Sequence, residues 1–197
     1  MIALERDLGN AKLQNLVNKS IELFWKFGFQ RVTIEELCRE SGVSKMTYYK
    51  HFNNKIDLVK FILREMTTQT YEKYNLILAQ DIPFEEKVRQ TIDLKMEQTE
   101  KMSQEFFRDV YAYNDPGLHD FVQAHLGKWI KKIHESFLEA QRKGDIRKDM
   151  KPEFIVYFLN HMTDMMNDEQ LKKLYANPQE QIRELINFFF YGILPVR

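Results

Sequence analysis

Residues 41–55 form a short basic segment of the kind that can bind phosphate. The segment contains no Asp or Glu, and it carries Lys45, Lys50, His51 and Lys55. Positive charge concentrated in one place attracts a nucleic-acid backbone, and binding then releases condensed counterions. A few lysines are more often a solvated surface than a binding site. The pattern therefore indicates nucleic acid only if the fold presents these side chains together.

The chain as a whole carries no net charge, which is unusual for a nucleic-acid binder. Its charges are unevenly distributed, however. Residues 1–60 hold ten Lys and Arg against seven Asp and Glu, so acids are in excess in the remainder. The excess of positive charge thus lies in the same part of the chain as the basic segment.

Two short helices are predicted around Gly42, and they position the basic segment. Thr33 and Glu36 have the spacing of a capping box, in which the Thr33 hydroxyl accepts from the Glu36 amide and the Glu36 carboxylate reaches back. The helix that starts there ends at Gly42 and buries Ile34, Leu37 and Cys38. Ser44 is placed to cap a second helix that continues to about His51.

This pattern is a helix-turn-helix, which places its second helix in the major groove of DNA. Gly42 can take the positive φ that the tight turn requires, and Val43 packs in the turn. On a helical wheel, Tyr48 and Phe52 share one side of the second helix. The other side carries Lys45, Thr47 and Tyr49. The sequence therefore predicts a reading helix with one buried and one exposed side.

Along the rest of the chain, apolar residues recur at intervals of three and four, and only 7 Gly and 5 Pro are present. This periodicity predicts an all-α protein. Further helices are expected over residues 11–27, 54–79, 83–101, 103–113, 118–143, 152–168 and 178–193. Breaks are expected at Asp115-Pro116-Gly117, Lys143-Gly144-Asp145 and Asn177-Pro178.

Three features predict a cytoplasmic protein without a membrane anchor. No segment approaches the roughly 20 apolar residues of a membrane helix. The segment Met1–Gly9 lacks the apolar core of a signal peptide. The single cysteine, Cys38, fits a reducing compartment, and we expect it to be a small core residue rather than a redox sensor.

Residues 11–60 resemble the tetracycline-repressor-like (TetR) family of bacterial transcriptional regulators. The match runs in register from Ile21-Glu22-Leu23-Phe24 and Gly28 through Thr33, Ile34, Leu37-Cys38, Ser41-Gly42-Val43-Ser44, Thr47, Tyr49 and His51-Phe52 to Lys55 and Leu58. The resemblance implies an N-terminal three-helix DNA-binding unit over residues 1–58. It also implies a helical bundle for ligand binding and dimerisation over residues 59–197, where the chain resembles the family only in length and helix order.

The resemblance also implies a DNA contact for each exposed side chain of the helix-turn-helix. Helix N-termini favour anions, which implies phosphate contacts for Thr33 and Ser44. Lysine suits guanine and a threonine methyl suits thymine, which implies base contacts for Lys45 and Thr47. Backbone contacts are implied for Tyr49, His51 and Lys55, and Lys50 can serve either role.

The sequence departs from the family pattern at two positions of the reading helix. Met46 stands where a small residue is common, and it either touches a thymine methyl or crowds the groove. Tyr48 stands where leucine is usual, and we expect it to fill the same core position. Met46 therefore belongs to the predicted DNA-binding residues and leaves the operator sequence open.

The last two predicted helices are the most apolar part of the chain. Phe188 and Tyr191 lie off the main apolar face of residues 178–193, so this helix needs two partners. The family resemblance implies that the second partner is another subunit. The expected interface residues are Phe154, Phe158, Met162, Met165, Ile182, Leu185, Ile186, Phe189 and Phe190. We therefore expect a homodimer on a pseudo-palindromic operator, with reading helices about 34 Å apart.

Methionine and aromatic residues are frequent beyond residue 80, and such side chains adapt to apolar ligands. Most of them are expected to form the core and the interface. The family resemblance implies that an unknown small molecule binds within the bundle. Candidate contacts are Met96, Phe106, Phe107, Tyr111, His125, Trp129, His161 and Met162.

The sequence therefore predicts a DNA-binding regulator, most simply a repressor that a small hydrophobic effector releases from DNA. A ligand-dependent activator of the same fold stays open, as does a helical interaction module without DNA binding. An enzyme is not expected, because phosphate-binding glycine loops, paired cysteines, nucleophile elbows and His-Glu metal motifs are missing from the sequence. Neither a cofactor nor a metal is expected.

Overall fold

The computed structural model describes residues 8–194, and all regular secondary structure in that range is helical, which confirms the predicted all-α fold. Within it, the description leaves out the side chains of Ala112, Leu126, Lys128, Trp129, Val156, Asn160, Thr163 and Asn167. The chain forms two compact units. Unit 1 contains the chain up to Thr70 and residues Lys101–Val122, whereas unit 2 contains Tyr71–Glu100 and the chain from Gln123 onward.

Unit 1 begins with three helices whose ends follow from local capping. Helix α1 (Ala11–Phe27) starts at Asn10, whose side chain accepts from the amides of Lys12 and Leu13, and it stops at Gly28. Helix α2 (Ile34–Ser41) is followed by a turn at Gly42 with a left-handed φ of 67°. Helix α3 (Lys45–Tyr49) is capped by Ser44 and is shorter than the predicted helix, which extends to about His51.

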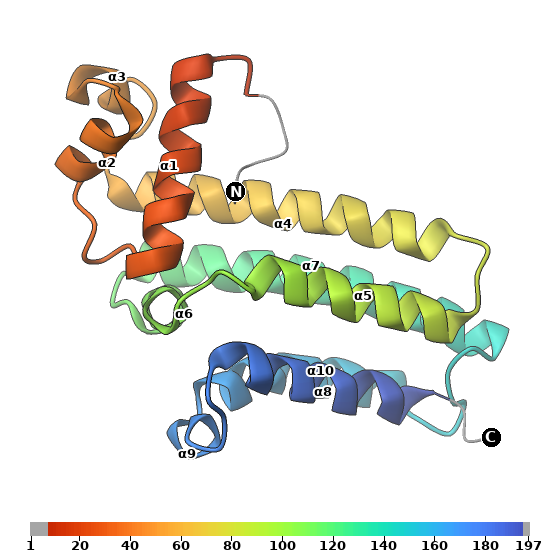
Figure 1. The fold of residues 1–197 in the computed structure, drawn as a ribbon. Helices are drawn as coiled ribbons and strands as arrows, with labels where there is room; N and C mark the ends of the chain where they lie inside the picture. The colour runs from red at the N-terminus through yellow and green to blue at the C-terminus, as the bar shows by residue number, and fades with distance from the viewer. Residues whose placement is uncertain (1–7, 195–197) are drawn as a thin grey trace. The chain divides into compact units, whose positions relative to one another are not determined.

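The other elements of unit 1 come from later in the chain. They are the N-terminal part of α4 (Lys55–Ala79), helix α6 (Gln104–Ala112) and the first turns of α7 (Pro116–Lys143) (Figure 1). Helix α6 packs on α1, where the Trp25 and Phe106 rings lie 4.2 Å apart. The shared core includes Leu16, Val17, Ile21, Phe24, Trp25, Phe29, Leu37, Tyr48, Phe52, Leu58, Ile62, Phe106 and Leu118.

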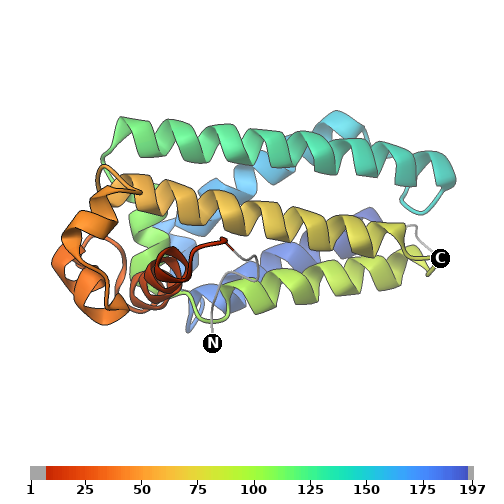
Figure 2. The ribbon, with the colours of Figure 1, turned by 90° about the horizontal axis from the view of Figure 1, so that it is seen from above.

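Unit 2 contains the remainder of α4, with α5 (Phe84–Thr99), most of α7, α8 (Pro152–Asn167), the short α9 (Glu169–Lys172) and α10 (Pro178–Ile193). The C-terminal part of α4 and α5 run antiparallel across a short loop (Figure 2). Helix α10 packs on both α5 and α8. The core of this unit is formed by Phe137, Ala140, Ile146, Ile155, Phe189 and Ile193.

Most helices other than α1 and α10 differ from the sequence prediction by one or more residues at an end, and one short helix is additional. Helix α7 begins at Pro116 rather than residue 118, because Asp115 caps it through the amide of Leu118 (2.6 Å). Pro83 lies just before α5 instead of being its first residue. Helix α9 is not expected from the sequence, since its single turn rests on Asp168, whose carboxylate accepts from the amides of Gln170 and Leu171.

Across the described residues, the helices are either too short or too polar to cross a lipid bilayer.

Candidate nucleic-acid interface

The short helix α3 has the two-sided character that the sequence predicts. Tyr48 is fully buried and packs against Phe52, with their ring centroids 5.8 Å apart. The Tyr48 hydroxyl donates to the carbonyl of Asn54 (3.1 Å), which ties α3 to the start of α4. Burial raises the pKa of Tyr48 above its usual value, so the phenol stays neutral. This side of α3 is therefore fixed to the core.

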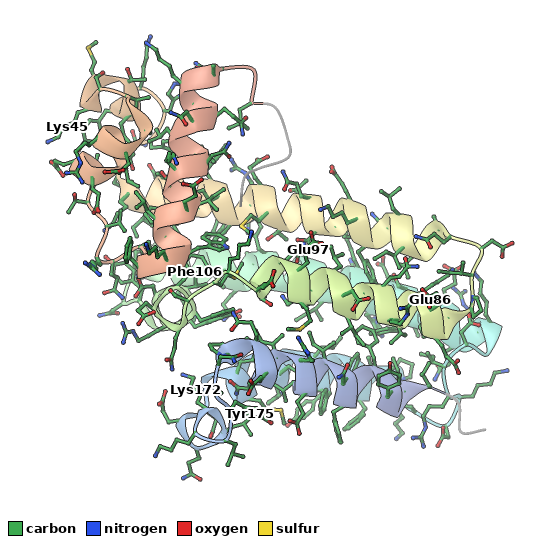
Figure 3. All side chains as sticks on the ribbon, viewed as in Figure 1. Lys45, Glu86, Glu97, Phe106, Lys172 and Tyr175 are labelled. Atoms are coloured by element: carbon green, nitrogen blue, oxygen red, sulfur yellow. The ribbon has the colours of Figure 1, made fainter. Side chains whose placement is uncertain are left out.

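The opposite side of α3 is open to solvent. Met46 is 81% exposed and Tyr49 is 52% exposed. Thr47 is partly exposed, and the remaining exposed side chains in this stretch are those of Lys45, Lys50 and His51. Lys45 lies on the outer side of the helix pair (Figure 3). The predicted DNA-contacting side chains from Lys45 to His51 are thus at least partly accessible to solvent.

Two hydroxyl groups cap the helices of this motif. Thr33 Oγ1 accepts from the amide of Glu36 (3.1 Å), which confirms that half of the predicted capping box. Ser44 Oγ accepts from the amide of Thr47 (3.1 Å) and lies 3.0 Å from Thr47 Oγ1. Thr33 and Ser44 are both exposed at helix N-termini, where amides and the helix dipole favour a phosphate.

Lys45 forms an ion pair that the sequence does not indicate. Its ammonium, on the first residue of α3, donates to the carboxylate of Glu35 in the first turn of α2. The hydrogen bond from Lys45 lowers the pKa of Glu35, and the pKa of Lys45 is raised by the same partner. Both groups are therefore charged at neutral pH. The only signal in the sequence is an acid in the first turn of a helix, which the helix dipole explains equally well.

Lys55 also has a structural partner that spacing does not reveal. Its ammonium donates to the carbonyls of Gln30 (2.9 Å) and Val32 (2.8 Å), in the loop between α1 and α2. Burial lowers the pKa of Lys55. Two of the three N–H donors are thus used inside the protein. The DNA-backbone contact expected for Lys55 stays a prediction, next to this role in holding the loop.

The same loop is also held by Asp109 of α6. This carboxylate is only 2% exposed, and it accepts from the backbone amide of Gln30 (2.8 Å) and from the Gln30 side chain (2.7 Å). Gly28 allows the close approach, since a Cβ there would lie 2.5 Å from an Asp109 oxygen. Helix α6 therefore positions the segment that leads into α2.

Val43 and Cys38 occupy the core positions that the sequence assigns to them. Both side chains are buried together with Leu37. Burial raises the pKa of the Cys38 thiol, which keeps it protonated. A protonated and buried thiol is a poor nucleophile, so Cys38 acts as a small apolar residue.

The residues expected to contact an effector are divided between the two units. Phe106, Phe107 and Tyr111 belong to unit 1, where Phe106 packs in the core against Trp25, beside the end of α1 (Figure 3). Unit 2 contains Met96, His125, His161 and Met162. The imidazole of His161 is exposed and stacks on Tyr157. The side chain of Trp129 lies outside the described residues. The effector contacts stay a prediction, and Phe106 has a clear packing role.

The residues expected at the dimer interface do not all lie on a free surface. Ile182, Ile186 and Phe189 are buried within the protomer's own core, and their place at a subunit interface stays a prediction. Helix α10 is apolar on nearly all sides, and the sequence does not show which side meets α5 and α8. Partly buried side chains are those of Phe158, Met162, Leu185 and Phe190, whereas Phe154 and Met165 are exposed.

A set of aromatic side chains on α8 and α10 is exposed instead. Phe188 is 72% exposed, and Phe154, Tyr157 and Tyr191 are each more than half exposed. Phe158 links the two helices, since its ring lies 6.4 Å from that of Phe154 and 6.2 Å from that of Phe188. We call these four exposed residues the aromatic face. Of the four, only Phe154 was among the predicted interface residues, whereas Phe188 and Tyr191 were expected only to lie off the main apolar face of their helix.

Within residues 8–194, no group of three His, Cys, Asp or Glu side chains has an arrangement that can hold a metal ion.

Residues 16–62 match the family model described as "Bacterial regulatory proteins, tetR family". The match begins in α1, includes α2 and α3, and ends in α4. It therefore spans the two-sided helix α3 and the capped turn that precedes it.

Two curated relatives carry names of transcription factors. The uncharacterized HTH-type transcriptional regulator YerO of Bacillus subtilis (strain 168) is 44% identical over 46 residues, which is 23% of this chain and 16% of YerO. The HTH-type transcriptional repressor DhaR of Mycobacterium sp. (strain GP1) is 22% identical over 151 residues, which is 74% of this chain and 75% of DhaR.

The fold extends the similarity beyond the helix-turn-helix. The crystal structure of the transcriptional regulator FadR from Bacillus subtilis, in complex with stearoyl-CoA, superposes with a TM-score of 0.70 at 13% identity. That similarity covers 92% of this chain and 99% of FadR. The family and the fold are those of transcriptional regulators. Residues 16–62 therefore carry the DNA-binding segment of the TetR family of bacterial regulatory proteins, and the described fold as a whole is similar to that of such a regulator.

Proposed function

We propose that this protein is a homodimeric transcriptional repressor that binds a pseudo-palindromic DNA operator through α3 and is released by a small hydrophobic molecule. The observation that supports DNA reading most directly is the two-sided character of α3. Tyr48 fixes the helix to the core, while Lys45, Thr47 and Lys50 remain at the surface. A five-residue helix has little need of these groups for its own stability, and they are suited to base edges and phosphates.

The aromatic face supports a second copy of the chain as a partner. Soluble monomers rarely expose large apolar patches, and aromatic residues are enriched at protein interfaces. Its residues come from two neighbouring helices, with Phe158 between them. Two copies related by a two-fold axis can bury the same face on each subunit. Such a dimer presents two α3 helices, as a palindromic operator requires.

A protein of similar fold supports a small apolar effector. FadR of Bacillus subtilis binds stearoyl-CoA, a molecule with a long apolar chain. Unit 2 of this protein has partly buried methionine and aromatic side chains, including Met96, Met162 and Phe190, that can adapt to such a ligand. A ligand releases the protein from DNA only if it binds one conformation better than the other.

Selection of bound duplexes from a random DNA pool tests DNA reading and identifies the operator in the same experiment. We expect one enriched motif with two inverted half-sites about one helical repeat apart. A matched control is the double substitution Lys45→Ala and Thr47→Ala, which leaves Tyr48 in the core and is expected to enrich no motif. Failure of the wild-type protein to enrich any motif would favour the helical interaction module instead.

A promoter that contains the selected motif then separates a repressor from an activator. The repressor proposal predicts that the protein lowers transcription from this promoter in a purified system. An increase in transcription that depends on an added acyl compound would favour the activator.

A further inference from the structure

The ion pair between Glu35 and Lys45 places an acid on the proposed DNA-reading surface. Glu35 is in the first turn of α2, and Lys45 is the first residue of α3. The side chains are 62% and 55% exposed, respectively, so the pair is solvated on the protein surface. An unpaired carboxylate at this place would repel the DNA backbone. The ion pair with Lys45 therefore offsets the repulsion that Glu35 would otherwise exert on the DNA backbone.

The ion pair is poorly suited to a role in stability. Exposed ion pairs generally contribute little, because solvent screens them and two side chains lose freedom. The fold of the motif is already accounted for by the Thr33 and Ser44 caps, the Gly42 turn and the buried Tyr48. The main effect of the pair is instead on Lys45, because Glu35 restrains its ammonium group and offsets its charge.

A restrained lysine behaves differently toward phosphates and toward bases. A free lysine is a flexible point charge that pairs with any phosphate within reach. When Glu35 offsets its charge, Lys45 gains less from phosphate and releases fewer counterions. One of its three N–H donors is used by Glu35, and the other two remain for the N7 and O6 acceptors of a guanine.

We propose that Glu35 is a specificity-determining residue, which acts by holding Lys45 so that this lysine favours a guanine edge over the DNA backbone. The inference rests on the proposed DNA-reading function and names a residue that sets its selectivity. Glu35 is a positioning residue in this account, because its effect on DNA passes through Lys45.

The test measures binding of wild-type and Glu35→Gln protein to the selected duplex and to a shuffled duplex over a range of salt concentrations. On the shuffled duplex, freeing Lys45 is expected to steepen the slope of log K against log salt by about 0.9 for each reading helix. That slope corresponds to roughly eightfold tighter binding at 0.1 M salt for each reading helix. Binding to the selected duplex is expected to change less, so that the ratio of the two affinities falls.

Two further variants show whether the effect passes through Lys45. In a Lys45→Met background, Glu35→Gln is expected to leave the affinity ratio and the salt slope unchanged, because no ammonium remains to be restrained. The matched control is Glu40→Gln, which removes the same charge from α2 but from a pair within that helix, with Arg39. This control is expected to leave the affinity ratio unchanged.

The possible outcomes separate the inference from the function on which it rests. If the wild type binds the selected and shuffled duplexes equally, the proposed function fails. If the wild type is selective but Glu35→Gln has the same affinity ratio and the same salt slope, the role proposed for Glu35 is wrong. An equal effect of Glu40→Gln, or a Glu35→Gln effect that persists without Lys45, also overturns it, since Glu35 would then act as a general charge or contact DNA directly.

Discussion

The three lysines of the basic segment occupy three different environments. Lys45 is paired with Glu35, Lys50 is exposed at the end of α3, and Lys55 donates to two carbonyls of the loop between α1 and α2. These three environments cannot be told apart from the residue type or from the net charge of the segment. The roles of the lysines toward DNA should therefore differ, even though they lie within eleven residues of one another.

Lys55→Met is expected to destabilise the protein, because the carbonyls of Gln30 and Val32 lose their donor. Losing hydrogen bonds to a charged donor of this kind costs about 1–3 kcal/mol. For a chain of this size, each kcal/mol lowers the melting temperature by roughly 2–4 °C. Thermal unfolding followed by circular dichroism measures the effect.

The control for this experiment is Lys50→Met, which should unfold like the wild type and bind DNA more weakly. Equal melting temperatures for Lys55→Met and Lys50→Met would show that the loop does not depend on Lys55.

Cys38 is expected to be unreactive in the folded protein. Burial raises the pKa of its thiol, so the thiolate fraction at pH 8 is smaller than that of a free cysteine. A disulfide reagent such as DTNB should therefore react slowly with native protein and rapidly in denaturant. Fast labelling of the native state would instead support a thiol that responds to redox conditions.

Residue positions were predictable where they follow from short-range rules, and less so where they depend on tertiary contacts. The Thr33 and Ser44 caps and the burial of Tyr48 follow from spacing along one helix. The partner of Lys45 depends on how α2 and α3 cross, and Glu35 is ten residues away in the sequence. That pairing could not be obtained from spacing alone.

The loop between α1 and α2 is fixed by two other helices. Lys55 of α4 binds its carbonyls, and Asp109 of α6 binds the amide and side chain of Gln30. This loop determines where α2 begins, and α2 in turn supports α3. Helix α6 therefore belongs to the machinery that positions the reading helix, although more than fifty residues separate it from α3.

Gly28→Ala is expected to destabilise the protein more than Gly42→Ala. Both glycines have positive φ, but Gly28 combines φ 74° with ψ 156°, a region nearly restricted to glycine. A Cβ at Gly28 would also lie 2.5 Å from Asp109, whereas a Cβ at Gly42 meets nothing within 4 Å. Gly42→Ala should cost about 1–2 kcal/mol, the usual left-handed penalty.

Urea unfolding of the two alanine variants measures these free energies. Gly28→Ala is expected to lose clearly more stability than Gly42→Ala. A smaller loss at Gly28 than at Gly42 would mean that the contact between Asp109 and this loop is not tight in solution.

Helix boundaries were predictable where a cap and a stop residue coincide. Helices α1 and α10 have the predicted bounds, because Asn10 and Asn177 cap them and, for α1, Gly28 ends it. Helix α9 is a single turn, which is too short to show apolar periodicity. The assignment of residues 1–58 and 59–197 to separate domains stays a prediction.

For the whole molecule, the main question left by the sequence was which side of α10 meets another subunit. Apolar residues lie all around this helix, so periodicity does not select a side. Packing on α5 and α8 buries Ile182, Ile186 and Phe189 and leaves Phe188 and Tyr191 exposed. We therefore place the proposed interface at the aromatic face.

Phe188→Glu is expected to convert the proposed dimer to a monomer, because a charge would be buried in an apolar interface. Light scattering at micromolar concentration measures the mass, and binding to the selected duplex should weaken with it. The matched control is Leu174→Glu, which places the same charge at a similarly exposed apolar residue outside the aromatic face.

A dimeric Phe188→Glu protein would show that subunits meet elsewhere. A wild-type protein that is monomeric under these conditions would remove the dimer from the proposal altogether.

The central claim is that the exposed side of α3 reads a base sequence, and Thr47 is its most specific test. The measurement is the affinity of wild-type and Thr47→Ala protein for every single base-pair variant of the selected duplex. We predict that Thr47→Ala relaxes the preference at one base pair in each half-site, by about 1–3 kcal/mol, and leaves the other positions unchanged. An equal loss of affinity on all sequences, or an unaltered preference at every position, would contradict reading by α3.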